Sequence, residues 1–162
     1  MAVSAIVQET GQQSTTANSY VTAAGYDQYL ENRYARTALG DVDANRRNIF
    51  RATTYFESLQ FIGYKATDEQ ALQWPRSQIL IDGYSYTSEE IPSEVLAAIY
   101  ELAYGYEQGY APDAPIQRES LKEKIGEIEV EYKASSAHRV LLPAASQALR
   151  KLVKNPMRVV RA

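Results

Sequence analysis

The sequence predicts a mainly α-helical protein, a small bundle of about four helices with a short β-strand or hairpin element before the last helix. Two patterns predict this class. Apolar residues recur at three- and four-residue spacings along most of the chain, whereas apolar and polar residues alternate over residues 126–132 and again in the C-terminal tail. The length of 162 residues suits one domain, because a chain of this size buries a sizeable core without a second lobe.

Composition and charge exclude several classes of function. The content of 45% apolar and 23% charged residues is typical of globular proteins and excludes wholesale disorder. The net charge of −3 argues against a surface that neutralises phosphates throughout, so any nucleic-acid contact is local. The chain has no cysteine, which excludes disulfides, cysteine-ligated metals and thiol catalysis. Its apolar stretches are short, and we expect a soluble protein made without a signal peptide.

The N-terminal third is expected to contain an arm and two helices. Residues 8–18 are polar and lack large apolar side chains, so we expect residues 1–18 to form a flexible arm before a single domain over residues 19–155. The first helix is predicted to run to Tyr34 with Thr22 as its cap. Asp41 is placed to cap a second helix that ends near Phe61–Gly63.

The middle of the chain is expected to hold the strongest helix. A short helical segment is predicted from Asp68 to Gln73, closed by Trp74–Pro75, and the Tyr-rich stretch Arg76–Glu90 is expected to be a loop. Pro92 then opens a helix with two adjacent apolar stripes. A face of that width can bury against two neighbouring elements.

The spacing of apolar residues changes twice in the C-terminal third of the chain. Apolar residues alternate with glutamates over Gly126–Tyr132, which predicts a half-buried strand, with Ile116–Ile125 as a candidate partner strand. A last amphipathic helix is predicted to begin at Pro143 and to stop at Asn155–Pro156. The tail, residues 156–162, alternates apolar and basic residues and can add as a strand to another protein.

The sequence contains no complete motif for catalysis or metal binding. His138 is the single histidine, and the Gly83–Thr87 stretch lacks the second glycine of a nucleophile elbow. The Asp41–Asn45 stretch starts like a calcium loop, but Arg46 stands where that loop needs glycine. We therefore expect a protein that is not an enzyme and that needs no metal or other cofactor.

The chain is unusually rich in tyrosine, with 13 residues against three phenylalanines. Tyrosine packs its ring while its hydroxyl stays in water, so it suits subunit interfaces, and Tyr84, Tyr86 and Tyr110 are the predicted interface residues. For the tyrosines within helices, half-buried core positions are the favoured interpretation.

Charge is uneven along the chain. Residues 138–162 carry six basic residues and no acid, while residues 82–131 hold twelve acids. This asymmetry suits head-to-tail contacts between copies, and a solvated tail is the alternative. The Tyr-rich stretch 84–110 contains no basic residue, which argues against single-stranded nucleic acid, because stacking rings and cations then lie in different segments.

Several motifs occur in a fixed order over roughly residues 17–155. They are Ala17–Val21, a Tyr–Leu–x–x–Arg ending at Arg33, Ala71–Arg76, Ile91–Pro92–x–x–Val95, Tyr100–Ala103 and the Gly126–Tyr132 strand. In this order they resemble the head–tail adaptor, or head-completion, proteins of tailed bacteriophages. Related sequences also carry the label DnaT-like single-stranded-DNA-binding. The block Trp74, Pro75 and Arg76 is the most specific of these motifs, and a buried tryptophan beside a turn is its purely structural interpretation.

The resemblance implies a structural virion protein of the connector-adaptor type, made in the host cytoplasm and located in the neck. It implies a homo-oligomeric ring, of about twelve copies, between the portal and the tail. Such a ring extends the channel for double-stranded DNA without sequence-specific contact and provides a docking site for a neck or tail-completion protein. No membrane partner and no cofactor are implied.

Two groups of site residues follow from these expectations. Glu127, Glu129 and Glu131 are predicted to face the channel, because an acidic wall repels DNA and lets it slide. The basic and apolar residues of the last helix and tail are predicted to bind the portal: Arg150, Lys151, Lys154, Met157, Arg158, Val159, Val160 and Arg161. The alternative function is that of a DnaT-like single-stranded-DNA-binding accessory protein of phage replication, which predicts salt-sensitive binding through the basic residues 139–161.

Overall fold

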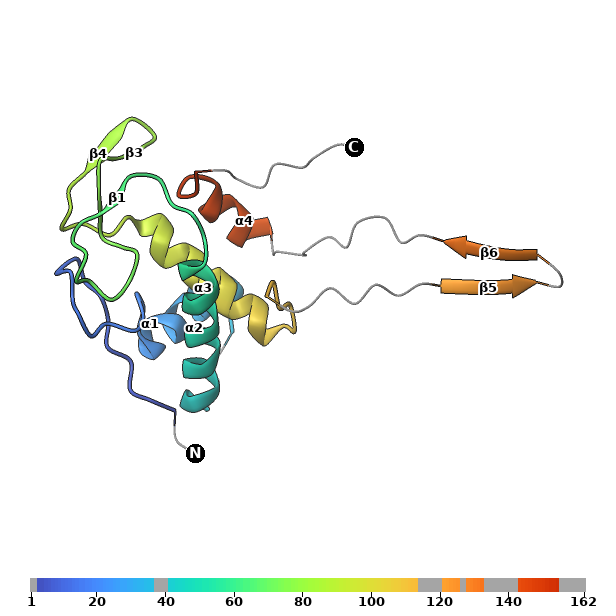
Figure 1. The fold of residues 1–162 in the computed structure, drawn as a ribbon. Coiled ribbons are helices and arrows are strands. Elements are labelled where there is room, and N and C mark those ends of the chain that lie inside the picture. The colour runs from blue at the N-terminus through green and yellow to red at the C-terminus, as the bar shows by residue number, and fades with distance from the viewer. Residues whose placement is uncertain (1–2, 37–40, 114–120, 126–127, 133–142, 155–162) are drawn as a thin grey trace.

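A computed structural model describes residues 3–36, 41–113, 121–125, 128–132 and 143–154. Within these residues four helices form the body and six strands form three two-stranded antiparallel sheets (Figure 1). The helices are α1 Ala23–Tyr34, α2 Val42–Glu57, α3 Ser93–Glu107 and α4 Pro143–Arg150. The strands are β1 Tyr64–Lys65, β2 Arg76–Ser77, β3 Ile79–Ile81, β4 Tyr84–Tyr86, β5 Leu121–Ile125 and β6 Ile128–Tyr132. The prediction of a mainly helical chain with a hairpin before the last helix is confirmed.

Helices α1 and α2 begin at the predicted caps. The Thr22 hydroxyl accepts a hydrogen bond from the Gly25 N–H at 3.0 Å, and Asp41 Oδ1 accepts from Asp43 and Ala44, each at 3.0 Å. These bonds satisfy N–H groups that have no partner within the helix. Helix α2 ends at Glu57, before the expected Phe61–Gly63.

Helix α3 is the centre of the body. It packs against α2 on one side and α4 on the other, which confirms the prediction of a face wide enough for two neighbours. Its buried residues include the apolar Val95, Ile99 and Leu102, which are at most 2% exposed. Glu101 is also buried on this helix, with 1% of its surface exposed.

The segment between α2 and α3 differs from both predictions made for it. Residues 68–73 form bends instead of a helix, because the Gln70 side chain bonds the backbone of Thr67, Leu72 and Pro75. The expected loop contains β2, β3 and β4, with Asp82 and Gly83 in the turn between β3 and β4. Both turn residues have positive φ, +52° and +86°, as a tight hairpin turn requires.

The N-terminal segment is anchored to the body, which corrects the expectation of a flexible arm for the described residues 3–18. Glu9 is 1% exposed, and its carboxylate accepts hydrogen bonds from the backbone of Gly11, Gln13 and Ser14 at 2.7–3.1 Å. Gln8 also forms a parallel bridge with Ser19. One buried carboxylate therefore organises a segment that is otherwise rich in small polar residues.

The hairpin formed by β5 and β6 lies between α3 and α4 in the sequence. Helices α3 and α4, which precede and follow the hairpin in the sequence, pack together. The predicted strand and its partner are both confirmed, and α4 begins at the predicted Pro143. Beyond Lys154 the chain is outside the described residues, and so are the predicted tail contacts of Met157, Arg158, Val159, Val160 and Arg161.

Candidate interaction surfaces

Several tyrosines donate hydrogen bonds to carboxylates, most of which are buried or half-buried. Glu101 accepts hydrogen bonds from the hydroxyls of Tyr29 at 2.5 Å and Tyr34 at 2.8 Å, and it also binds Arg33 Nε at 2.6 Å. The same pattern joins Tyr20 to Glu57, Tyr26 to Glu107 and Tyr106 to Asp113. Burial, and then the adjacent acid, raise the pKa of the Tyr29 hydroxyl above its ordinary range, so it stays a donor. Tyr26 and Tyr106 are buried and Tyr29 is half-buried, which confirms the core interpretation for these three, whereas Tyr34 is 36% exposed.

The Trp74–Pro75–Arg76 block is part of the core. Trp74 is fully buried against Phe61, and Arg76 is 7% exposed. The Arg76 guanidinium donates to the carbonyl oxygens of Ile62, Gly63 and Gln73 at 2.8–3.1 Å. Burial lowers the pKa of Arg76 from its ordinary value, and nearby Glu57 opposes that effect. The block therefore closes backbone turns, as its structural interpretation predicts, and offers little surface to a partner.

The three tyrosines predicted at subunit interfaces differ in exposure. Tyr84 is 74% exposed and Tyr110 is 43% exposed, whereas Tyr86 packs partly against the core. Tyr84 and Tyr86 lie on strand β4, whereas Tyr110 follows α3. The three tyrosines therefore do not belong to one element of the fold. Their contact with another subunit stays a prediction.

The basic segment that follows α4 contacts the acidic middle of the same chain. Lys151 Nζ lies 2.5 Å from Asp82 Oδ2 and 3.7 Å from Glu94 Oε1. The hydrogen bond to Asp82 and the acidic charge raise the pKa of Lys151. Arg150, beside it, is exposed. Part of the charge asymmetry is thus neutralised within one subunit, which leaves less of it for contacts between copies.

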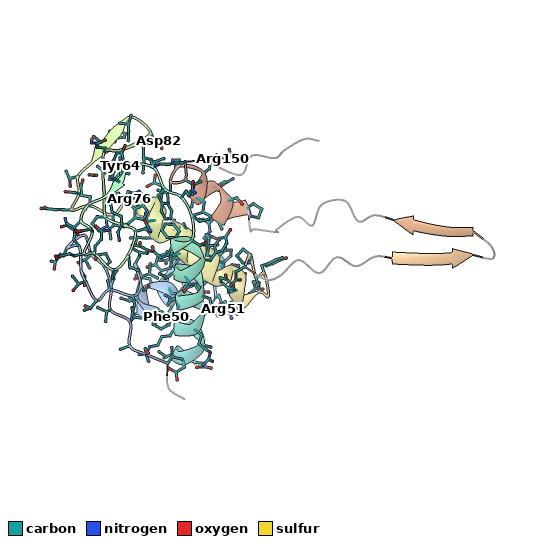
Figure 2. The ribbon with its side chains drawn as sticks, viewed as in Figure 1. Phe50, Arg51, Tyr64, Arg76, Asp82 and Arg150 are labelled. Atoms are coloured by element: carbon teal, nitrogen blue, oxygen red, sulfur yellow. The ribbon has the colours of Figure 1, made fainter. Side chains whose placement is uncertain are left out.

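The fold also brings an exposed tyrosine beside a cation of the C-terminal segment. Tyr64 is 64% exposed, and Lys154 Nζ lies 5.8 Å from the centre of its ring. An antiparallel bridge between Phe61 and Val153 sets this distance. Figure 2 shows Tyr64, Asp82 and Arg150 at the same end of the body. The expectation that rings and cations lie apart is corrected at this position, because it considered only the tyrosines of residues 84–110.

Most of the arginines described on the helical surface are paired with acids. Four ion pairs share this feature: Arg33–Glu101, Arg36–Glu107, Arg46–Asp43 and Arg47–Asp41. Arg51 instead lies 4.4 Å from the centre of the Tyr106 ring. The described helical surface therefore carries both signs of charge in close alternation, which weakens its long-range attraction for a polyanion.

The register of the β5–β6 hairpin changes the expectation of an acidic face. Lys122 pairs with Glu131, and Lys124 pairs with Glu129. Paired positions of an antiparallel sheet share one face, so two lysines stand on the face expected to be acidic. Glu127 lies outside the described residues. That this face lines a channel stays a prediction, but repulsion of DNA by an unbroken acidic wall is no longer its physical basis.

The described residues contain no cluster of three His, Cys, Asp or Glu side chains suited to a metal ion. In the same part of the chain, no helix has both the length and the apolar character needed to span a membrane. Two features of the described residues are candidates for binding a partner. One is the end of the body with exposed Tyr64, Lys154 and Arg150, and the other is the β5–β6 hairpin with its open strand edges.

Comparison with known proteins places the chain in a family. Residues 4–162 match the family described as "Putative DnaT-like ssDNA binding protein", and the chain belongs to that family. No curated protein and no solved structure matched the chain. The description agrees with the alternative function predicted from the sequence, and it does not mention head–tail adaptors.

Proposed function

We propose that the chain is a structural assembly protein, a head–tail adaptor that forms a ring between the portal and tail of a phage. The observation that carries this proposal is the β5–β6 hairpin, inserted between two helices that pack together without it. A two-stranded hairpin is marginally stable alone and gains stability when another surface covers it. The motifs of the sequence outside the hairpin, from Ala17–Val21 to Tyr100–Ala103, supply further support.

The described surface supports a protein partner better than a polyanion. The large exposed side chains Tyr64, Leu80 and Tyr84 are 64–74% exposed and lie on or beside β-strands. The end of the body that holds Tyr64 carries charges of both signs, as the Lys151–Asp82 pair illustrates (Figure 2). Aromatic anchors within a polar surface of mixed charge are characteristic of protein interfaces.

The portal contact is assigned to the C-terminal end of the chain. A chain truncated after Asn155 lacks the basic and apolar tail but keeps α4 and the Phe61–Val153 bridge. We expect an unchanged melting temperature and loss of binding to purified portal rings. Binding that survives the truncation contradicts this assignment, and the full chain's failure to bind any portal ring contradicts the adaptor function.

Single-stranded DNA binding is the second candidate, and the family's description favours it. The Tyr64 ring and the Lys154 ammonium provide the required combination of an exposed stacking surface and an adjacent cation. Arg150 is exposed at the same end of the body (Figure 2).

Fluorescence anisotropy with a labelled thymine oligonucleotide tests this second function. Binding is expected to weaken as salt rises, and Tyr64→Ala should reduce affinity about tenfold, since stacking contributes about 1–3 kcal/mol per base. Tyr110→Ala is the matched control, because Tyr110 is also exposed but follows α3. Equal effects of the two substitutions contradict a site at Tyr64.

A further inference from the structure

The β5–β6 register divides the hairpin into two unlike faces. One face holds the pairs Leu121–Tyr132, Glu123–Val130 and Ile125–Ile128, of which Glu123 is the single charged member. The other face holds the pairs Lys122–Glu131 and Lys124–Glu129. The hairpin is therefore amphipathic, with an apolar face that no other strand of its own sheet extends.

The charged face is also divided between the two strands. Both of its lysines stand on β5, and both of its described glutamates stand on β6. Each strand is an edge of a two-stranded sheet and leaves half of its backbone N–H and C=O groups unpaired within that sheet. One open edge is thus basic and the opposite open edge is acidic.

We propose that β6 of one copy pairs with β5 of the next copy, so that the hairpins of successive subunits form one continuous antiparallel sheet. This inference rests on the ring assembly in the proposed function and names the element that joins the copies. When two hairpins point the same way, β6 and the neighbouring β5 run antiparallel, as β5 and β6 do within one chain. The acidic edge then meets the basic edge of the next copy.

The geometry favours a second copy over an unrelated occupant. A hairpin with one basic and one acidic edge is complementary to itself in head-to-tail order, and a rotation that closes a ring leaves no edge unpaired. The apolar positions of successive copies also continue on one face, so that each addition extends one amphipathic sheet. The interaction is heterologous, because the two edges that meet are different.

A charge exchange between the two strands tests the proposal. The fourfold variant Lys122→Glu, Lys124→Glu, Glu129→Lys, Glu131→Lys keeps opposite charges within each chain and between identical copies. A contact between variant and wild type, however, places acid against acid and base against base. We expect each protein to associate alone to the same size, and mixed assemblies to be depleted at least about tenfold.

The measurement is co-purification of untagged variant with affinity-tagged wild type after both are dissociated in salt and reassembled. Untagged wild type is the control and should co-purify fully. Variant that co-purifies equally well overturns the proposal, and so does a wild-type chain that stays monomeric at every concentration tested. If such a monomer still binds the portal, the adaptor function is supported while the pairing of hairpins is contradicted. Portal binding therefore distinguishes failure of this inference from failure of the proposed function.

A second variant tests the same proposal if the fourfold variant does not fold. Replacing residues 114–142 with a short Gly/Ser linker removes the hairpin and keeps the packed helices α3 and α4. We expect this variant to remain folded by circular dichroism and to be monomeric at concentrations where the wild type associates. Association equal to that of the wild type overturns the proposal.

Discussion

At the scale of single residues, Glu101 is the polar centre that attaches α1 to α3. Its buried carboxylate is shared by Tyr29, Tyr34 and Arg33. Glu101→Gln removes the charge and one acceptor oxygen, leaving a buried hydroxyl without its partner. We expect a loss of about 1–3 kcal/mol in the free energy of unfolding, measured by urea titration. Exposed Glu89→Gln is the control, and an equal effect at both positions contradicts this role for Glu101.

Glu57 is expected to give the protein a pH-dependent stability. Burial is the main cause that raises its pKa above the ordinary 4.5, while hydrogen bonds from Tyr20 and Gln73 oppose the shift. A carboxyl group with a raised folded-state pKa contributes stability that is present below pH 4.5 and lost as pH rises through the folded value. The unfolding free energy of wild type minus Glu57→Gln should therefore be larger at pH 4.5 than at pH 8. The opposite trend contradicts the burial assigned to Glu57.

At the scale of elements, a glycine pins the N-terminal segment to the body. Gly11 and Gly83 both have positive φ, but a Cβ at Gly11 would lie 2.0 Å from the Glu89 carbonyl oxygen, while none of the described atoms lies within 4 Å at Gly83. Gly83→Ala should cost about 1 kcal/mol for backbone strain alone. Gly11→Ala should cost clearly more in a denaturant titration, because backbone must also move. Equal costs would show that the segment is not held there.

The hairpin is the element whose removal should leave the body intact. In the linker variant lacking residues 114–142, α4 keeps its contacts with α3, and Leu149 and Leu152 stay buried. We expect a melting temperature within about 5 °C of the wild type, because the core lies in the remaining helices. A calorimetric scan measures this. A much lower melting temperature shows that the hairpin contributes to the body as well as to assembly.

At the scale of the whole molecule, patterns between neighbouring residues in the sequence predicted the helices and the C-terminal hairpin. Contacts between residues far apart in the sequence were not predicted. The caps Thr22 and Asp41 act on N–H groups two or three residues away, so their effect is readable from adjacent letters. The Asp82–Gly83 pair is also a local signal, because Asp–Gly is typical of the tight turn that joins two strands such as β3 and β4. The Tyr64–Lys154 contact joins positions 90 residues apart and depends on how α4 packs.

The same distinction explains the tyrosines. Tyr26 and Tyr29 are three residues apart in α1, but the acids that accept their hydroxyl hydrogen bonds come from α3 and are brought to them only by the fold. Lys122 and Lys124 are similar, because their place opposite Glu131 and Glu129 depends on the strand register. Charge counted along a sequence therefore differs from charge at a surface, both in the hairpin and at Lys151.

The adaptor function is tested most directly by locating the protein. Under the proposed adaptor function the chain is encoded by a phage, whose purified virions can be labelled with gold-conjugated antibodies against this protein and imaged in negative stain. The account predicts label at the neck, between the head and the tail. Virions that carry no label, together with salt-sensitive binding of the purified chain to single-stranded DNA, would contradict the adaptor function and support the second candidate.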